Sequence, residues 1–556
     1  MILDISLGLE SERSTALPFV WLAIVFLLAL PQTVSLKELT LYRLAHYEAL
    51  GSLYGSPTTL IDMELATVNS TTNLARKCLI APLEILGINL FTELVERNIG
   101  AMVVMIPDEL SKLGIHARDR WLELETQLLT PDVPIPVYFA PSEQHQWRQV
   151  YEGVKANELI HASPFSFGYL RFVSTQYNHA LRTVSTQGVQ SPALLKNVTL
   201  LNLQGSLGGE NKNPTITLSA NIDTFCSSPL QCYGYRACGG VASLLAIASL
   251  FSRLYADEQS RPDYNILFLL TLGGGSNLNF ISLKKAIESP EKLKTSYLHV
   301  HSKFSISLDD LGGERLYAHF VKTPNEGTFG ASFVNRLEAN MKIGVVSEDR
   351  EVSVVTRKVN KLSFDNQAWP HEQFYLSRVV GTTLSSNSEA DSPLSHSVLD
   401  REGGYSEDYL YENTQAIAET LAQIIFNSKQ DNITYLKGTH SIDRSYLKAI
   451  HKFIYKYPRP IQALGSHNVL IKTLKDWLSA ASTEFDFAKI EINTREDGSY
   501  EFYDELQLIT EVSKVKPPIF DLMLFLVVLL YLGVIGGCMY WVREWVNKRK
   551  RKEKYN

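Results

Sequence analysis

Apolar and polar positions along the chain follow two patterns, one typical of buried strands and one of amphipathic helices. Residues 264–272 are a continuous apolar run, which favours a strand buried on both faces. Residues 414–426 repeat their apolar positions at helical spacing. Strands that alternate with helices predict an α/β fold with a mixed central sheet flanked by helices. Further strands are expected at 198–207, 215–220, 304–308 and 316–321, and a helix at 241–254.

Two apolar segments determine the expected topology. Residues 17–30 are a short apolar run followed by small residues, which is typical of a cleaved signal peptide, with an uncleaved anchor as the alternative. Residues 519–542 are long enough to cross a bilayer as one helix, and the positive-inside rule places the basic residues after it in the cytosol. The sequence predicts a single-pass type I membrane protein with its body in the lumen.

Composition shifts and proline-rich turns divide the chain further. Apolar runs at 101–107 and 133–140 predict a smaller α/β lobe before the main domain. The expected organisation is a signal peptide at 1–35, an N-terminal segment with the smaller lobe at 36–190, a main α/β domain at 191–430, a mostly helical lumenal segment at 431–516, a transmembrane helix at 517–542 and a basic cytosolic tail at 543–556.

Charge is distributed unevenly. The formal net charge is −6, and the last fourteen residues hold seven basic and two acidic side chains, so the part before them has a net charge of −11. An acidic body with a basic end argues against direct nucleic-acid binding and favours a membrane. Lys552 and Lys554 have the spacing of a dilysine retrieval signal for the endoplasmic reticulum, with a purely electrostatic tail as the alternative.

Other features agree with a lumenal body. Asn69, Asn197 and Asn432 begin glycosylation sequons.

Four cysteines precede the predicted membrane helix, and in an oxidising compartment they allow two disulfides with three connectivities open. They are Cys78, Cys226, Cys232 and Cys238.

The main domain resembles the zinc aminopeptidases that use two metal ions. In that family a strand ends in His-x-Asp, and the corresponding residues here are Asn221 and Asp223. Asp309 matches a later metal ligand of the family. The resemblance implies a zinc-aminopeptidase-like domain that retains two vestigial ligand positions.

The remaining positions of the two-metal site have lost their chemistry. Tyr235 stands where the bridging aspartate is expected, Gly273 and Gly274 replace the general base and a ligand, and Ser386 stands near the last histidine. Loss of a general base alone costs about 10²–10⁴-fold in rate. The sequence therefore predicts a pseudo-peptidase without catalytic residues, metal or other cofactor.

His371-Glu372 begins like the His-Glu-x-x-His zinc motif but lacks its second histidine, so it gives only a weak indication of a metal site. Gly533 and Gly537 place small residues on one face of the predicted membrane helix, which permits close packing of a partner helix.

A more specific resemblance rests on 251–255, on 265–268 running into 273–275, and on 515–522. In these segments, and from the signal segment to the basic end, the chain resembles the nicalin family, which is related to nicastrin. The resemblance implies a noncatalytic scaffold of the endoplasmic reticulum membrane. It also implies a complex with the Nodal modulator protein and a small multi-pass membrane protein.

That complex would lie in the ribosome-associated assembly at the Sec translocon and assist the biogenesis of multi-pass membrane proteins, with antagonism of Nodal signalling as a further expectation. Two rival functions stay open: a residual metallo-aminopeptidase, and a nicastrin-like substrate receptor of a membrane protease complex.

Overall fold

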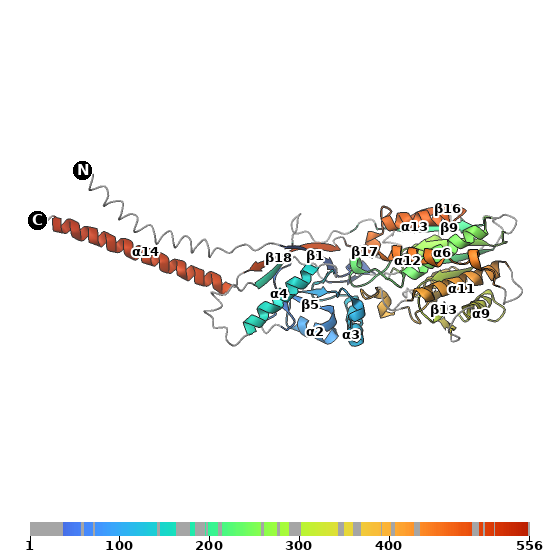
Figure 1. Cartoon of the computed structure of the whole chain (residues 1–556), viewed down its shortest axis with the longest axis horizontal. Helices are drawn as coiled ribbons and strands as arrows, with labels where there is room; N and C mark the ends of the chain where they lie inside the picture. Colours follow the sequence, from blue (N-terminus) through green and yellow to red (C-terminus); the bar gives the residue numbers. More distant parts are fainter. Residues whose placement is uncertain are drawn as a thin grey trace.

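The structure is a computed structural model, and it describes residues 37–49, 51–56, 61–69, 73–141, 145–162, 178–183, 195, 198–208, 214–256, 261–274, 278–288, 302–342, 350–359, 368–390, 392–401, 406–426, 434–491, 500–503, 506–515 and 518–553. A small lobe and a large lobe follow each other along the long axis, and helix α14 (Pro518–Glu553) projects beyond the small lobe (Figure 1).

The small lobe is a sheet that closes on itself. Its strand order is β1–β18–β8–β4–β5–β6–β7, and β7 pairs with β1. The neighbours β4, β5, β6 and β7 run parallel, and helices carry the chain back from β5 to β6 and from β6 to β7. The strands are β1 (Lys37–Arg43), β4 (Asp62–Thr67), β5 (Cys78–Pro82), β6 (Ala101–Met105), β7 (Val137–Ala140), β8 (Asn178–Thr183) and β18 (Gln507–Val515), and the helices are α2 (Ile88–Glu96), α3 (Ile115–Leu128) and α4 (His145–Ala162).

The large lobe is built on an eight-stranded mixed sheet in the order β14–β13–β15–β12–β10–β11–β9–β16. Strand β10 lies between β11 and β12 and runs parallel to both, while β9 is antiparallel to β11. The strands are β9 (Thr199–Leu207), β10 (Thr215–Asn221), β11 (Asn265–Thr271), β12 (Ser302–Leu308), β13 (Leu316–Phe320), β14 (Val352–Thr356), β15 (Gly381–Ser385) and β16 (Glu484–Glu491).

Helices flank this sheet, as the hydrophobic pattern predicts. Every residue of β11 is buried, which confirms the expected fully buried strand at 264–272. The helices are α6 (Cys238–Leu254), α7 (Ile281–Glu288), α9 (Phe329–Met341), α10 (Pro370–Leu376), α11 (Glu407–Ile425), α12 (Arg444–Tyr455) and α13 (Val469–Ala480). The mixed α/β fold expected from the sequence is confirmed.

Helix α6 passes unusually close to the end of β12. A side-chain carbon added at Gly240 would lie 2.4 Å from the Leu308 carbonyl oxygen, so only glycine permits this contact. The closeness explains the glycine at position 240 in the first turn of α6, a helix of which most residues are buried.

The C-terminal part of the body differs from the prediction. Residues 431–516 were expected to be mostly helical, but from Glu484 onwards the described residues form strands. β16 joins the large sheet, β18 pairs with β1 in the small lobe, and β17 (Tyr500–Phe502) pairs with β2 (Tyr47–Ala49), which also pairs with β3 (Ser52–Tyr54). Strand pairing with distant parts of the chain decides the conformation here, because each strand fills an open edge.

Several predicted features lie outside the described residues: the signal peptide at 1–35, and the side chains of Asn197, Asn432 and Lys554. Asn69 is described and exposed. Within the described residues, no helix has both the length and the apolar character needed to cross a membrane.

Candidate functional site

The carboxyl ends of four neighbouring strands meet at one edge of the large sheet. β10, β11, β12 and β15 run in the same direction, so the residues that follow them gather there. Asn221 ends β10, and the loops after β11 and β12 begin with Leu272 and Asp309. The structure thus brings together the positions that the aminopeptidase resemblance assigns to a metal site.

Asp223 is fully engaged with the backbone at this edge. Its carboxylate accepts hydrogen bonds from the Gly273 N–H at 2.7 Å and the Gly274 N–H at 3.3 Å. The Asn221 side-chain oxygen accepts a third bond from the Gly274 N–H at 3.1 Å. A carboxylate that accepts backbone N–H bonds is stabilised as an anion without a metal ion.

The glycines at this edge are required by the backbone. Gly273 has a φ of +90°, where other residues are strained. A side-chain carbon on Gly274 would lie 2.6 Å from the Asn221 Cγ atom and 2.7 Å from a Phe280 ring carbon. Of the two positions predicted to have lost an acidic residue, Gly274 therefore has no room for a side chain, and Gly273 has a backbone conformation that other residues rarely adopt.

Asp309 and Ser386 are also tied to nearby polar groups. The Ser385 hydroxyl donates to an Asp309 carboxylate oxygen at 2.9 Å. The Ser386 hydroxyl accepts the Gly313 N–H at 2.8 Å. Both positions now connect the β12 and β15 loops to each other.

The Tyr235 side chain packs against aromatic rings of α12. Its ring packs edge-on against His451 and Tyr455, with ring centroids 4.6 and 4.7 Å away. His451 also forms a hydrogen bond of 3.0 Å with the Tyr235 carbonyl oxygen. Burial lowers the pKa of His451 to about 4, so this histidine is neutral and structural.

The charged cluster in this region is formed by residues that the sequence analysis missed. The Arg236 guanidinium lies 3.8 Å from an Asp310 carboxylate oxygen, and the Arg236 N–H donates to Asp400 Oδ1 at 3.2 Å. Burial raises the pKa of Asp310 to about 6 and that of Asp400 to about 7. A guanidinium is thus the cation that faces these acids. The two consecutive aspartates Asp309 and Asp310 could have indicated this charged cluster from the sequence, whereas nothing in the sequence indicated Asp400.

No group of three or more metal-ligating side chains is assembled within the part of the chain that the structure describes. The partial zinc motif His371-Glu372 makes structural contacts. His371 is buried with its Nδ1 atom 2.9 Å from the Thr383 hydroxyl, and Glu372 forms an ion pair with Arg357 at 2.9 Å. The absence of catalysis stays a prediction.

The four cysteines that the sequence offers as disulfide candidates are free thiols in the structure. Cys78 belongs to the core of the small lobe, and Cys238 accepts a hydrogen bond from the buried guanidinium of Arg459 at 2.7 Å. Cys226 and Cys232 lie beside each other, and burial raises the pKa of Cys226 well above its usual value. Separate burial in two lobes prevents Cys78 and Cys238 from pairing, because a disulfide needs α-carbons within about 7 Å.

Next to the site, a buried glutamate joins the two lobes. Glu125, on α3 of the small lobe, accepts hydrogen bonds from the Trp121 ring N–H at 2.8 Å, the Ser227 hydroxyl at 2.5 Å and the Val398 N–H at 3.0 Å. The Ser227 N–H at 3.3 Å and the Ser397 hydroxyl complete the set. Burial raises the pKa of Glu125, and the bonds from Ser227 and Ser397 oppose that shift.

Comparison with known proteins places the chain among relatives of similar length. No family model matches it. A zebrafish (Danio rerio) protein, BOS complex subunit ncln, is 29% identical over 552 residues, which cover 95% of this chain and 94% of the relative. A Caenorhabditis elegans protein, nicalin, is 25% identical over 527 residues and 89% of each chain. The chain is similar to nicalin along nearly its whole length. The resemblance to the nicalin family is confirmed.

Among solved structures, the crystal structure of the gamma-secretase component nicastrin aligns with a TM-score of 0.59 at 9% identity. The alignment covers 85% of this chain and 97% of nicastrin, so the nicalin-like chain has a nicastrin-like fold. Zinc aminopeptidases align at TM-scores of 0.28 to 0.30, which carry no weight for fold or chemistry.

Proposed function

We propose that this chain is a noncatalytic scaffold of the endoplasmic reticulum membrane and a subunit of a BOS-type complex. The observation that carries the proposal is similarity to a BOS complex subunit over 95% of the chain. The engagement of Asp223 by the backbone N–H groups of Gly273 and Gly274 supports a role without catalysis.

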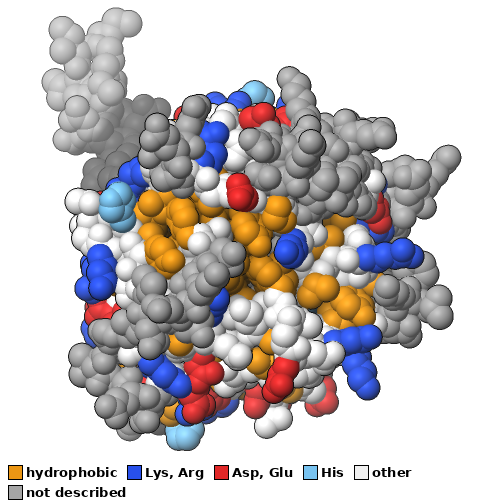
Figure 2. Space-filling view, turned by 90° about the vertical axis from the view of Figure 1, so that its right-hand side faces the viewer, with side chains coloured by type: hydrophobic (Ala, Val, Ile, Leu, Met, Phe, Trp, Pro, Cys, Tyr) orange, Lys and Arg blue, Asp and Glu red, His pale blue; other side chains and the backbone are white. Residues whose placement is uncertain are grey.

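The proposed partners are those that the nicalin resemblance implies: the Nodal modulator protein, a small multi-pass membrane protein and the Sec translocon with its ribosome-associated assembly. The role is assistance in multi-pass membrane protein biogenesis, with antagonism of Nodal signalling as a further consequence. Hydrophobic side chains that gather on the end of the large lobe opposite α14 support a partner-binding body (Figure 2).

Membrane anchoring is proposed for α14. Large apolar side chains along it are exposed, including Leu530 at 70%, Val534 at 63% and Trp541 at 67% of their full accessible surface. A helix that exposes such residues in water would lose the hydrophobic stabilisation that a bilayer supplies. The basic residues at the end of α14 support a cytosolic tail.

Gly533 and Gly537 are proposed to form a packing face on α14. A side-chain carbon added at either would meet no atom within 4 Å, so the face is open in this chain. Replacing both with leucine is expected to weaken association with membrane partners. Unchanged co-purification of the double variant in mild detergent would refute the packing face.

Retrieval to the endoplasmic reticulum is proposed to depend on Lys552 and Lys554. Replacing both with serine is expected to release the protein to the Golgi, where glycans on Asn69, Asn197 or Asn432 become resistant to endoglycosidase H. Glycans that stay sensitive would show that retention does not depend on these lysines.

The decisive experiment is affinity purification of the full-length chain in mild detergent, with partners identified by mass spectrometry and zinc measured on the same sample. Translocon components without stoichiometric zinc would support the scaffold. One zinc per chain or more without membrane partners would support a residual metallo-aminopeptidase. Co-purification of an intramembrane protease would instead support the nicastrin-like receptor.

A further inference from the structure

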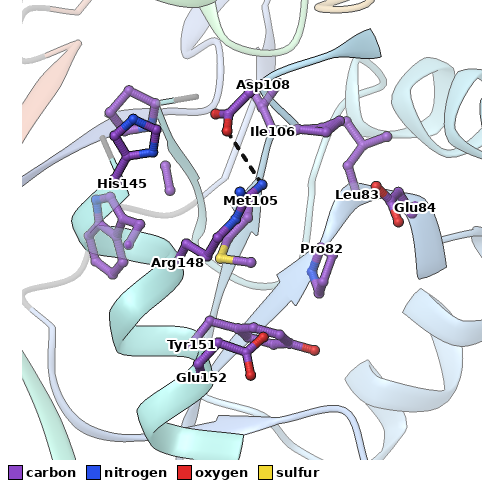
Figure 3. Close-up of a pocket in the computed structure, with 14 residues that line it drawn as sticks. Pro82, Leu83, Glu84, Met105, Ile106, Asp108, His145, Arg148, Tyr151 and Glu152 are labelled. Atoms are coloured by element: carbon purple, nitrogen blue, oxygen red, sulfur yellow. Dashed lines mark ion pairs between the residues drawn. The ribbon is translucent and has the colours of Figure 1, made fainter. Parts of the chain in front are cut away.

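A cavity lies in the small lobe, away from the edge of the large sheet that holds Asp223 and Asp309 (called the emptied site below). It has a volume of about 200 Å³ and opens where β5, β6 and β7 end and α4 begins (Figure 3). Neighbouring parallel strands place their carboxyl ends at one edge, which is where open α/β sheets bind ligands. The position therefore suits a binding site, and its chemistry decides what can bind.

The floor of the cavity lacks the donors that such crevices usually offer. Pro82 ends β5, Pro107 follows β6 by two residues, and Pro141 follows β7 directly. Proline has no N–H, so each strand end presents a carbonyl oxygen and an apolar ring instead of a donor. The prolines at the strand ends therefore offer no N–H to an anion, and the backbone N–H groups of a helix start at this cavity are those of the first turn of α4.

The rim is acidic. Arg148 is paired with Asp108 across 3.4 Å, and this pair closes one side of the cavity (Figure 3). Glu84 and Glu152 come from the segments after β5 and along α4, and neither forms an ion pair in the described structure. The side chains that line the cavity thus include three carboxylates and one guanidinium. Two further cations lie next to the lining: Arg120 donates to the Glu84 carbonyl oxygen at 3.1 Å, and the Lys155 Nζ atom lies 6.0 Å from the centroid of the Tyr151 ring.

The walls add apolar and aromatic surface. Met105 and the Tyr151 ring both line the cavity, and in Figure 3 Met105 lies to the left of Pro82 and Tyr151 below it. Burial raises the pKa of Tyr151, and the nearby Glu152 adds to that shift, so the ring stays neutral and electron-rich. The Lys155 contact shows that this ring attracts a cation, and a planar cation in the cavity would gain the neighbouring carboxylates as well.

We propose that this cavity binds one arginine side chain presented by a partner polypeptide. Its volume is below the roughly 300–1,000 Å³ of pockets for drug-sized ligands, so it accommodates a side chain and not a folded peptide. The guanidinium would lie against Tyr151 between Glu84 and Glu152. The proposal does not depend on which complex the protein joins.

The test measures binding of N-acetyl-arginine amide to the full-length chain in detergent, with N-acetyl-citrulline amide as the uncharged probe of nearly the same shape. The arginine probe is expected to bind and the citrulline probe to bind at least about tenfold more weakly, with an affinity that falls as salt rises. Equal binding of both probes, or no binding of the arginine probe, would overturn the proposal.

Variants connect binding to the cavity. The double variant Glu84→Gln/Glu152→Gln is expected to weaken arginine binding by about tenfold or more. The control Glu96→Gln/Glu123→Gln removes the same charge from exposed positions on α2 and α3 and should leave binding unchanged. Equal affinity in the two double variants would refute the site.

A third variant predicts a change of opposite sign. Arg148→Gln releases Asp108 from its ion pair, so the cavity gains an unpaired carboxylate and the arginine probe should bind more tightly. An unchanged or weaker affinity would contradict the assigned role of the rim. All variants lie on exposed or partly exposed positions, and their thermal unfolding should match that of the wild type.

Discussion

Replacement of Glu125 tests whether the lobes are held together by one buried carboxylate. Glu125 is 1% exposed and accepts five hydrogen bonds, three of them from N–H groups, which can donate but cannot accept a hydrogen bond. In Glu125→Gln one oxygen becomes an NH₂ group that faces donors. The loss is smallest when this group faces Trp121 and Ser397, because the Ser397 hydroxyl can turn to accept while the Trp121 N–H cannot.

The expected loss in the free energy of unfolding follows from the Trp121 N–H, which would face the new NH₂ group and have no acceptor. A buried donor without an acceptor costs about 1–3 kcal/mol, so Glu125→Gln is expected to lose that amount. Glu125→Ala leaves every donor without its acceptor and is expected to lose about 3–5 kcal/mol. Glu123→Gln, on the exposed face of the same helix, is the matched control and should change stability by less than about 0.5 kcal/mol.

The assay is urea unfolding of the full-length chain, followed by tryptophan fluorescence because Trp121 contacts the mutated side chain. Limited proteolysis at sites between the lobes reports separation directly. The first unfolding transition is the quantity compared, since a two-lobe protein does not unfold in one step. Burial raises the pKa of Glu125. Wild-type stability in both Glu125→Gln and Glu125→Ala would refute the interlock.

Two further predictions concern the large lobe. Gly274→Glu, which restores an acid beside Asp223, is expected to lower stability by about 1–3 kcal/mol through contact with Asn221 and to recruit no zinc, as thermal unfolding and elemental analysis would show. Unchanged stability with one bound zinc would contradict the account of the emptied site. Burial lowers the pKa of His371 to about 3, so the unfolded chain takes up a proton below pH 6.5 that the folded chain does not. As pH is lowered from about 6 to 4, this group should therefore reduce the free energy of unfolding by about 1.4 kcal/mol per pH unit. His371→Asn should lack that part of the slope in urea titrations over the same pH range. Identical slopes in the two proteins would exclude this assignment.

Strands and helices with strong local patterns could be predicted from the sequence. The run at 264–272 is β11, and the helix at 241–254 is α6 with three more residues at its start. The closure of the small lobe could not be predicted, because β1 and β18 pair across nearly the whole chain and Thr510 bonds to Leu39 from 471 residues away. Alternation shows which face of a strand is buried, and it does not identify the partner strand.

The candidate site was predictable only in part, for a related reason. Positions that follow strands could be aligned with the aminopeptidase pattern, and Asn221, Asp223 and Asp309 do lie together at one edge. Arg236 and Asp400 could not be found, because one lies in a short turn and the other in a loop without a regular pattern. The contact between them depends on loop geometry that hydrophobic periodicity does not encode.

The acids of the emptied site and the loops beside it have a common structural consequence. Asp223 ties the end of β10 to the loop after β11, and Asp400 binds the backbone N–H of Arg236. Three residues before Asp400, Ser397 donates to Glu125 of the small lobe, so the same loop joins the charged cluster to the lobe interface. In a two-metal enzyme such acids must stay available to metal ions and water. Here their hydrogen bonds hold strand ends and loops in one arrangement, which agrees with the proposed noncatalytic scaffold.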